Sequence, residues 1–122
     1  MNLVGLEYGK WLGGMTWNFI ATVRPHYRLT EYVADRKFQK LTKDPLVHQT
    51  FYALEWDRDT NFTHAHLLLN ADNSLSRENL AKKLGVNPKA VGFFQTVVDQ
   101  KAVSNYCTKQ IGTNAIHYNV FI

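Results

Sequence analysis

Short runs of apolar residues, many of them aromatic or β-branched, recur along the chain between segments that carry Pro, Gly, Asn and Asp. Runs of this kind are typical of β-strands. We expect five strands, at Trp17–Val23, Phe51–Trp56, Phe62–Leu69, Val91–Val98 and Ile116–Phe121. Between them, a Ser, Thr or Asp precedes residues with helical apolar spacing, the pattern of a capped helix. We expect three helices, from Thr30 to about Leu41, from Ser76 to Leu84 and from Asp99 to about Ile111.

Only the polar segment Asp57–Asn61 separates the second and third predicted strands, so we expect these strands to pair as an antiparallel hairpin. The predicted order is strand, helix, strand, strand, helix, strand, followed by a further helix and strand. This order indicates an α+β fold of the ferredoxin-like kind, in which a split β-α-β core forms a central antiparallel sheet and a C-terminal helix is added. In the first helix, Tyr32, Val33 and Phe38 are expected to face inward.

Two histidines interrupt the apolar third strand, which reads FTHAHLLL. Side chains alternate between the faces of a strand, so His64, His66 and Leu68 should share one face. Imidazoles about 7 Å apart along a strand can converge on one divalent ion, and histidine is the commonest metal ligand. A lone histidine in a strand more often has a structural role. For a pair on one face, metal binding and a structural role are equal alternatives.

A carboxylate on the neighbouring strand could complete such a site. If the hairpin turn is centred near Asp59 and Thr60, Glu55 lies opposite the two histidines, with Cβ atoms about 5 Å from its cross-strand partner. A glutamate is costly to bury unless something pairs with it. Asp57 competes with Glu55 for this role. Two imidazoles and a carboxylate, with no thiolate, suit Mg²⁺ or Mn²⁺ better than a structural zinc site.

The last predicted helix has an unusual polar face. In the sequence DQKAVSNYCTKQIG, residues with helical spacing place Tyr106 beside Lys109 and Gln110. A tyrosine in a helix is usually a packing residue and a lysine is usually solvated. Beside a histidine pair of the metal-binding type, a tyrosyl oxygen could instead act as a covalent nucleophile and a lysine could stabilise developing charge.

Length and charge narrow the context. The 122 residues predict one domain, 1–122, and the net charge of +4 favours polyanionic partners. The single cysteine, Cys107, cannot form an intrachain disulfide, and no run is long enough to span a membrane. The N-terminal segment also has the wrong charge order for a secretory signal. We therefore expect an intracellular protein without membrane contact.

These motifs resemble those of the HUH endonucleases. The sequence His64-Ala65-His66 resembles their histidine-hydrophobic-histidine motif, and Tyr106-Cys107-Thr108-Lys109 resembles the tyrosine-x-x-lysine motif of the rolling-circle replication initiators (Rep). The segment Phe19-Ile20-Ala21-Thr22 loosely resembles their first motif. The three occur in the family's order and span most of the chain. The resemblance implies a single-tyrosine HUH nuclease domain that nicks and joins single-stranded DNA, with the added helix as the catalytic one.

The same resemblance implies roles for individual residues. Tyr106 would attack the scissile phosphate and leave a 5′-phosphotyrosine and a free 3′-hydroxyl. His64, His66 and an acidic residue such as Glu55 would hold Mg²⁺ or Mn²⁺, and Lys109 would neutralise charge. The chain has no GxxxxGK[ST] loop, so we expect no helicase domain and a dependence on a host helicase and polymerase. The source would be a small virus or plasmid, and the substrate an origin or hairpin.

Gln110 supports a different member of the superfamily. It lies four residues after Tyr106, as does the third metal ligand of the single-tyrosine transposases, and Gly92–Val97 faintly resembles their sequence. Those enzymes exchange the tyrosine helix between subunits, so a homodimer with a shared site is the corresponding alternative. We favour the initiator because Glu55 is well placed in the hairpin and Lys109 has the motif spacing.

Basic and aromatic residues are the candidates for DNA contacts, because single strands bind in cationic grooves with stacking aromatics. These candidates are Arg24, Tyr27, Arg28 and Lys101, whereas Lys82 and Lys83 are expected to be simply solvated. Two other functions remain open. One is a non-catalytic module that binds single-stranded nucleic acid, and the other is a metal-dependent hydrolase without a covalent step.

Overall fold

The computed structural model describes residues 16–57, 62–99, 102 and 116–122. Their helices and strands follow the predicted order. The elements are β1 (Phe19–Val23), α2 (Glu31–Thr42), β2 (Val47–Trp56), β3 (Thr63–Ala71), α3 (Arg77–Leu84), the short 3₁₀ helix η1 (Pro88–Ala90), β4 (Val91–Thr96) and β5 (His117–Phe121). The structure is therefore α+β, as the sequence predicts, and the strand boundaries differ from the predicted ones by a few residues.

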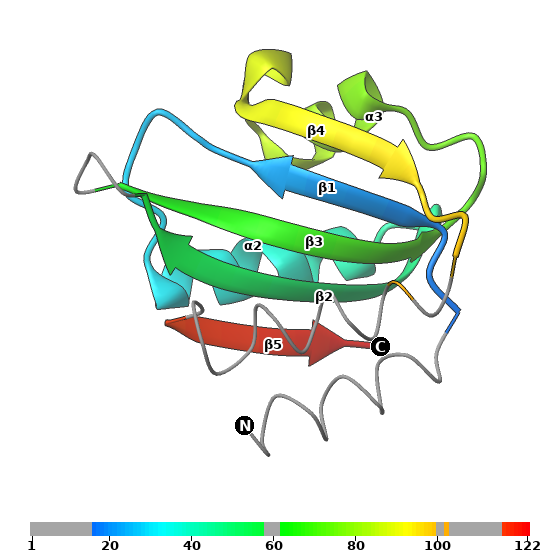
Figure 1. The fold of residues 1–122 in the computed structure, drawn as a ribbon, viewed down its shortest axis with the longest axis horizontal. Coiled ribbons are helices and arrows are strands. Elements are labelled where there is room, and N and C mark those ends of the chain that lie inside the picture. The colour runs from blue at the N-terminus through cyan, green and yellow to red at the C-terminus, as the bar shows by residue number, and fades with distance from the viewer. Residues whose placement is uncertain (1–15, 58–61, 100–101, 103–115) are drawn as a thin grey trace.

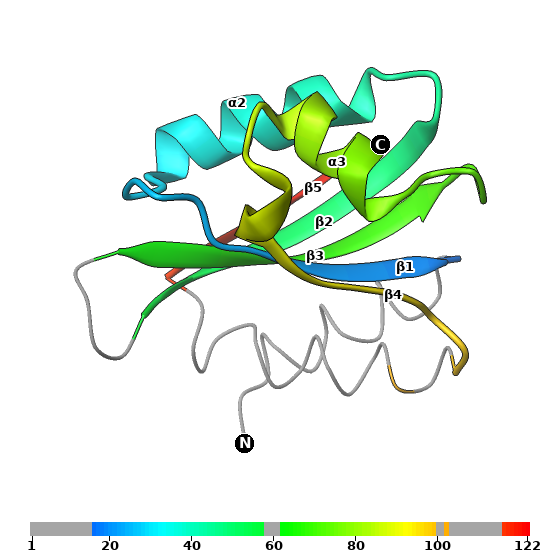
Figure 2. The same cartoon turned by 90° about the horizontal axis from the view of Figure 1, so that it is seen from above.

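The five strands form one open antiparallel sheet in the order β4-β1-β3-β2-β5 (Figure 1). The two histidines of the predicted third strand thus lie on β3, the central strand. Both described α-helices, α2 and α3, cover the same face of this sheet (Figure 2). The opposite face carries the two histidines of the third predicted strand, and the candidate site lies on that face.

The helix ends are set by the residues that the sequence indicates. The side chain of Thr30 accepts a hydrogen bond from the backbone N–H of Val33, and Ser76 caps α3 in the same way through Asn79. Gly85 ends α3 with φ of 69°, a left-handed conformation that favours glycine. The Thr30 and Ser76 side chains each satisfy a backbone N–H that the first turn of a helix leaves without a partner.

Two predictions about the fold need correction. Tyr32 does not face inward: its exposed fraction is 68%, because the buried stripe of α2 runs through Ala34, Phe38 and Leu41, and Tyr32 points away from that stripe. The second strand begins at Val47, earlier than predicted, because β2 keeps pairing with β3 as far as Ala71. The sequence of that extension is too polar to be recognised as a strand, and its pairing with β3 stabilises it as one.

The alternation of β3 divides its side chains between two buried clusters. Ala65, Leu67 and Leu69 pack in the main core beneath the helices, whereas Leu68 is buried on the other face with Trp17 and other residues. His64 and His66 share the face of Leu68, because they are separated from it by even numbers of residues. The predicted division of this strand is therefore confirmed.

The predicted catalytic helix lies largely outside the described residues. Of Asp99 to Ile111, the structure describes Asp99 and Ala102, and the N–H of Ala102 donates to the carbonyl of Asp99 at 3.1 Å. Among the helices of residues 16–57, 62–99 and 116–122, none has the length and apolar character that crossing a membrane requires.

Candidate metal centre

The hairpin of β2 and β3 brings Glu55 beside the histidines, as its register requires. Glu55 is the direct cross-strand partner of His64, and Ala53 is the partner of His66. Partners in an antiparallel pair point to the same face, so the carboxylate and both imidazoles lie on the face opposite the helices. The hairpin closes where the N–H of Asp57 donates to the carbonyl of Phe62 at 2.9 Å. The predicted position of Glu55 is therefore confirmed.

Three potential ligand atoms converge at this point. Oε1 of Glu55 lies 2.8 Å from Nε2 of His64 and 3.2 Å from Nε2 of His66, and the two Nε2 atoms are 3.2 Å apart. Neighbouring ligands of an octahedral ion held at about 2.1 Å are separated by about 3.0 Å. The three atoms therefore have the spacing of one triangular face of a coordination sphere.

Each imidazole is held from behind by a second side chain. Nδ1 of His64 contacts Oδ1 of Asp57, and Nδ1 of His66 lies 3.4 Å from the hydroxyl oxygen of Thr22 on β1. When the Nδ1 proton is donated to these oxygens, Nε2 carries a lone pair and faces the other ligands. Metal-binding histidines characteristically donate their second N–H to such a partner.

Arg24 in turn holds Asp57. Its Nη1 donates to Oδ1 of Asp57 at 2.6 Å, so one carboxylate oxygen is shared by the guanidinium and the His64 ring. Arg24 lies just beyond the end of β1, where the pairing of β1 with β4 shifts register between Thr22 and Val23. Such irregularities re-aim side chains near sites. A chain of contacts thus runs from Arg24 through Asp57 to His64 and Glu55.

The protonation states also suit metal binding. Burial raises the pKa of Glu55, but hydrogen bonds and charge interactions with His66 and His64 outweigh this effect and hold it below its ordinary value. Burial lowers the pKa of His66 below its ordinary value, against the opposing influence of Glu55. At neutral pH these directions give an ionised carboxylate and a neutral imidazole. Those are the forms that bind a metal ion.

The second carboxylate oxygen of Glu55 also favours metal binding at this site. Oε2 of Glu55 is buried and has no hydrogen-bond partner among the described residues. An unpaired buried carboxylate oxygen is costly, and a cation at the centre of the three ligands would offset that cost. Glu55, His64 and His66 thus form a group that could hold a metal ion.

A hollow of about 520 Å³ adjoins the centre on the same face of the sheet. His66 forms one side, and Phe93 on β4 forms another with 41% of its surface exposed. The remaining lining residues are Ile20, Thr22, Arg24 and Gly92. Among the described residues, this space thus adjoins the ligand triangle at His66 and is also lined by an aromatic ring and a cation.

The structure brings some of the other predicted residues to the site and not others. Arg24 reaches it through Asp57, as described above. Arg28 instead lies over the ring of Trp56, with Cζ 4.4 Å from the ring centroid, and Tyr27 lies beside Lys37 of α2. Neither contacts the three ligands. The predicted residues Tyr106, Lys109, Gln110 and Lys101 lie outside the described residues.

Two residues that hold the histidines were not predicted in that role from the sequence, Asp57 and Thr22. Asp57 was a competing candidate for the third ligand, yet it contacts Nδ1 of His64, on the far side of the ring from Glu55. Alternation along the first predicted strand could have indicated Thr22, because it places Thr22 on one face with Ile20. In the sheet, Thr22 is the direct partner of His66.

Comparisons of the chain with protein-family models, with curated proteins and with solved structures find no match. The fold and the geometry of the three ligands are therefore the observations from which a function can be inferred.

Proposed function

We propose that the chain is a metal-dependent nicking and joining enzyme for single-stranded DNA, of the HUH endonuclease kind, and that it initiates replication of a small virus or plasmid. The observation that carries the proposal is the triangle formed by Nε2 of His64, Nε2 of His66 and Oε1 of Glu55 on the face of the sheet opposite α2 and α3. Two histidines held by oxygen partners, with a carboxylate from the adjacent strand, supply three protein ligands among the described residues. Three protein ligands, where a structural site has four, favour catalysis over a structural metal.

The proposed reaction transfers a phosphodiester to Tyr106. The phenolic oxygen attacks the phosphorus, the bond from phosphorus to the 3′-oxygen breaks, and a 5′-phosphotyrosine forms. The phenol loses its proton to solvent or a base, and the departing 3′-oxygen gains one. Reversal of the same step, with a 3′-hydroxyl as the nucleophile, joins the strand again. Lys109 would neutralise charge that develops on the phosphate.

The described residues contribute binding and orientation. Glu55, His64 and His66 would hold Mg²⁺ or Mn²⁺, which supplies positive charge to an oxygen of the scissile phosphate when bound. Asp57 and Thr22 fix the ring orientations of the two histidines. The hollow beside His66 can admit a nucleotide, with Phe93 as a stacking surface.

The finer description of the fold belongs to the same proposal. We infer a ferredoxin-like split β-α-β arrangement to which a catalytic helix at Asp99 to Ile111 is added. Two observations support this inference: β1 and β3 are central neighbours in the sheet, and both α2 and α3 lie on one face of it (Figure 2). The opposite face is then the one to which Tyr106 must come.

The position of Glu55 favours an initiator over a transposase. In the single-tyrosine transposases the third ligand comes from the tyrosine helix, at the position that Gln110 occupies here. Glu55 already stands 2.8 Å from His64 Nε2, so the three-ligand set is complete without Gln110. We therefore propose a site built within one chain. A homodimer that exchanges the helix is the outcome expected of the alternative.

The proposed partners follow from the reaction. The substrate is an origin or hairpin in single-stranded DNA, because the enzymes that the motifs resemble act on single strands. A host helicase and polymerase would unwind and extend the DNA, in the cytoplasm of the host cell.

Covalent capture tests the proposal directly. The protein is incubated with a pool of short single-stranded oligonucleotides and Mn²⁺, and mass spectrometry is used to search for a nucleotide attached to Tyr106. We expect the adduct in the wild-type chain and its loss in Tyr106→Phe, while Tyr27→Phe keeps it as a matched control. Metal-dependent cleavage without an adduct would indicate a hydrolase. DNA binding with no cleavage under any metal would indicate a non-catalytic module.

A further inference from the structure

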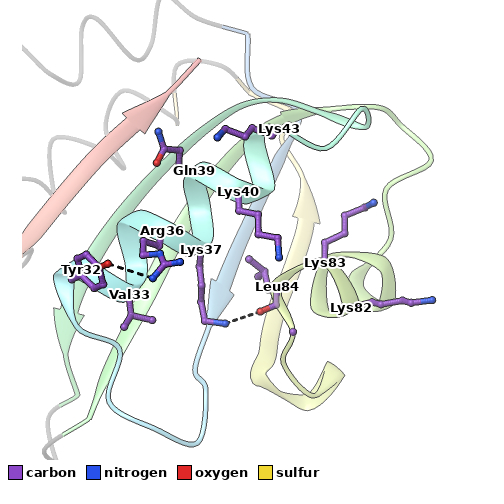
Figure 3. A pocket seen from close by; sticks show the side chains of 11 residues that line it. Tyr32, Val33, Arg36, Lys37, Gln39, Lys40, Lys43, Lys82, Lys83 and Leu84 are labelled. Carbon is purple, nitrogen blue, oxygen red and sulfur yellow. Dashed lines mark hydrogen bonds between the residues drawn. The ribbon is translucent and has the colours of Figure 1, made fainter.

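The largest concentration of positive charge in the described part of the chain lies away from the metal centre. A groove of about 620 Å³ runs between α2 and α3, on the helix-covered side of the sheet (Figure 3). Six cationic residues line it and no acidic residue does. They are Arg36, Lys37, Lys40, Lys43, Lys82 and Lys83.

Two of these cations have local partners that hold the walls of the groove together. Nζ of Lys37 donates to the carbonyl of Leu84 at 2.8 Å, which joins α2 to the end of α3 (Figure 3). Lys83 pairs with Asp44 at 2.7 Å. The exposed Lys40, Lys43 and Lys82 have no such side-chain partner among the described residues. Their charge is therefore available to a ligand.

Helix dipoles explain only part of this arrangement. Lysines in the last turn of a helix are favoured by its negative end, and Lys40, Lys82 and Lys83 lie in last turns. Arg36 lies in the middle of α2, where that effect is absent. Arg36, Lys40 and Lys43 also follow helical spacing, so they form a line of charge about 10 Å long. A line of that length matches an extended polyanion better than a single anion.

An exposed aromatic ring stands at one end of the groove. Tyr32 lines it with 68% of its surface exposed. The guanidinium of Arg36 lies 5.6 Å from the Tyr32 ring centroid, and its Nη1 donates to the Tyr32 hydroxyl at 3.3 Å. An exposed tyrosine on the outer side of a helix contributes nothing to the core. Beside a row of cations, it has the composition of a base-stacking platform.

We propose that this groove, between α2 and α3, binds a single nucleic-acid strand. The phosphates lie along the cations of α2 and α3, and a base stacks on Tyr32. The site is separate from the metal centre, because the helices and the three metal ligands lie on opposite faces of the sheet. The chain can thus hold a second segment of strand while another occupies the proposed catalytic face. The combination of charge with an exposed ring favours nucleic acid over an acidic protein.

Charge removal with a matched control tests the electrostatic part. Lys40→Gln with Lys82→Gln removes two groove charges, and Arg77→Gln with Lys89→Gln removes two exposed charges elsewhere. Binding of a labelled thymidine strand of about 20 nucleotides is followed by anisotropy, in EDTA, between about 50 and 200 mM salt. We expect the groove variant to lose about tenfold in affinity and about 1.4 in the salt slope. Equal losses in the two variants would overturn the proposal.

Tyr32 provides the test that distinguishes nucleic acid from an acidic protein. Tyr32→Ala should weaken binding of the same strand about tenfold with an unchanged salt slope, and Tyr32→Phe, which keeps the ring, should bind as wild type. Polyglutamate of similar length serves as the competing polyanion. Loss of polyglutamate binding in the groove variant, together with wild-type DNA binding by Tyr32→Ala, would assign the groove to an acidic partner and overturn the proposal. These readouts need neither metal nor an adduct on Tyr106, so they stand or fall separately from the proposed catalysis.

Discussion

Asp57 and His64 are joined through the ring nitrogen that faces away from the proposed metal. Oδ1 of Asp57 contacts Nδ1 of His64, while Nε2 on the other side of the ring lies 2.8 Å from Glu55. Asp57 therefore fixes both the tautomer and the angle of the imidazole without occupying a ligand position. His64 is thus a proposed ligand, whereas Asp57 is the residue that orients it.

Asp57→Asn should weaken Mn²⁺ binding without abolishing it. The amide oxygen can still accept the Nδ1 proton, but the negative charge that raises the basicity of His64 is lost. We expect a decrease of about 10- to 100-fold in affinity, measured by calorimetric titration of Mn²⁺. Asp72→Asn, an exposed change on the same residue type, serves as the control. If Asp57→Asn removes binding as completely as His64→Ala does, Asp57 is itself a ligand and our assignment is wrong.

Arg24→Gln should have a smaller effect that depends on salt. The Arg24 side chain is 53% exposed, and exposed ion pairs contribute about 0.2–1 kcal/mol. We expect Mn²⁺ affinity to fall about two- to fivefold at low salt and the difference to shrink near 1 M NaCl. In a double-mutant cycle, the effect of Arg24→Gln should disappear in the Asp57→Asn background. A loss that persists there would mean that Arg24 acts on the site by another route.

Glu55 and Gln110 offer a direct comparison between the two proposed members of the superfamily. Glu55→Ala removes an atom of the ligand triangle, so its loss of Mn²⁺ affinity should exceed the about 100-fold limit of an orienting residue. Gln110→Ala should leave Mn²⁺ affinity near that of wild type. The reverse result, with Gln110 dominant, would support a transposase-like site. Sedimentation of both variants shows whether the change in affinity accompanies a change in oligomeric state.

Much of the fold could be predicted because local signals agree with the long-range structure. Thr30, Ser76 and Gly85 carry the chemistry of helix ends, and the structure places helix ends at all three. The triangle of Glu55 with the two histidines also follows from sequence, since a hairpin with a short connection has few registers. Alternation then fixes the faces on which these residues lie.

The remaining features depend on distances that no local pattern contains. The role of Asp57 is decided by which nitrogen of a rotatable ring it meets, and neighbouring positions in sequence do not determine that choice. Lys82 and Lys40 belong to helices whose packing on the sheet makes one groove, so neither sequence segment reveals it alone. Tyr32 was misassigned because an aromatic residue near a helix start fits the apolar pattern on either side of the buried stripe.

A part-buried hydrogen bond on the helix side predicts a pH-dependent stability. The hydroxyl of Tyr52, which is fully buried, donates to Oδ1 of Asp35 on α2, and His117 and Asn119 of β5 contact the same oxygen. Burial raises the pKa of Asp35, but the hydrogen bonds from Tyr52, His117 and Asn119 outweigh it, so the pKa lies below its ordinary value. Burial and Asp35 together raise the pKa of Tyr52, which therefore stays protonated.

The sign of the effect follows from these directions. Because the folded-state pKa of Asp35 is lowered, its ionised form stabilises the fold above the ordinary value of 3.8, and this stabilisation is lost as pH falls through the folded-state pKa. Tyr52→Phe should lower the free energy of unfolding by about 1–2 kcal/mol at pH 7, measured with urea. The difference from wild type should shrink as pH falls below 3.8 and through the lowered folded-state pKa, because Asp35 then becomes protonated. Tyr27→Phe, at an exposed ring, should show neither effect, and a Tyr52→Phe difference that stays constant down to pH 2 would show that Asp35 is not the acceptor that matters.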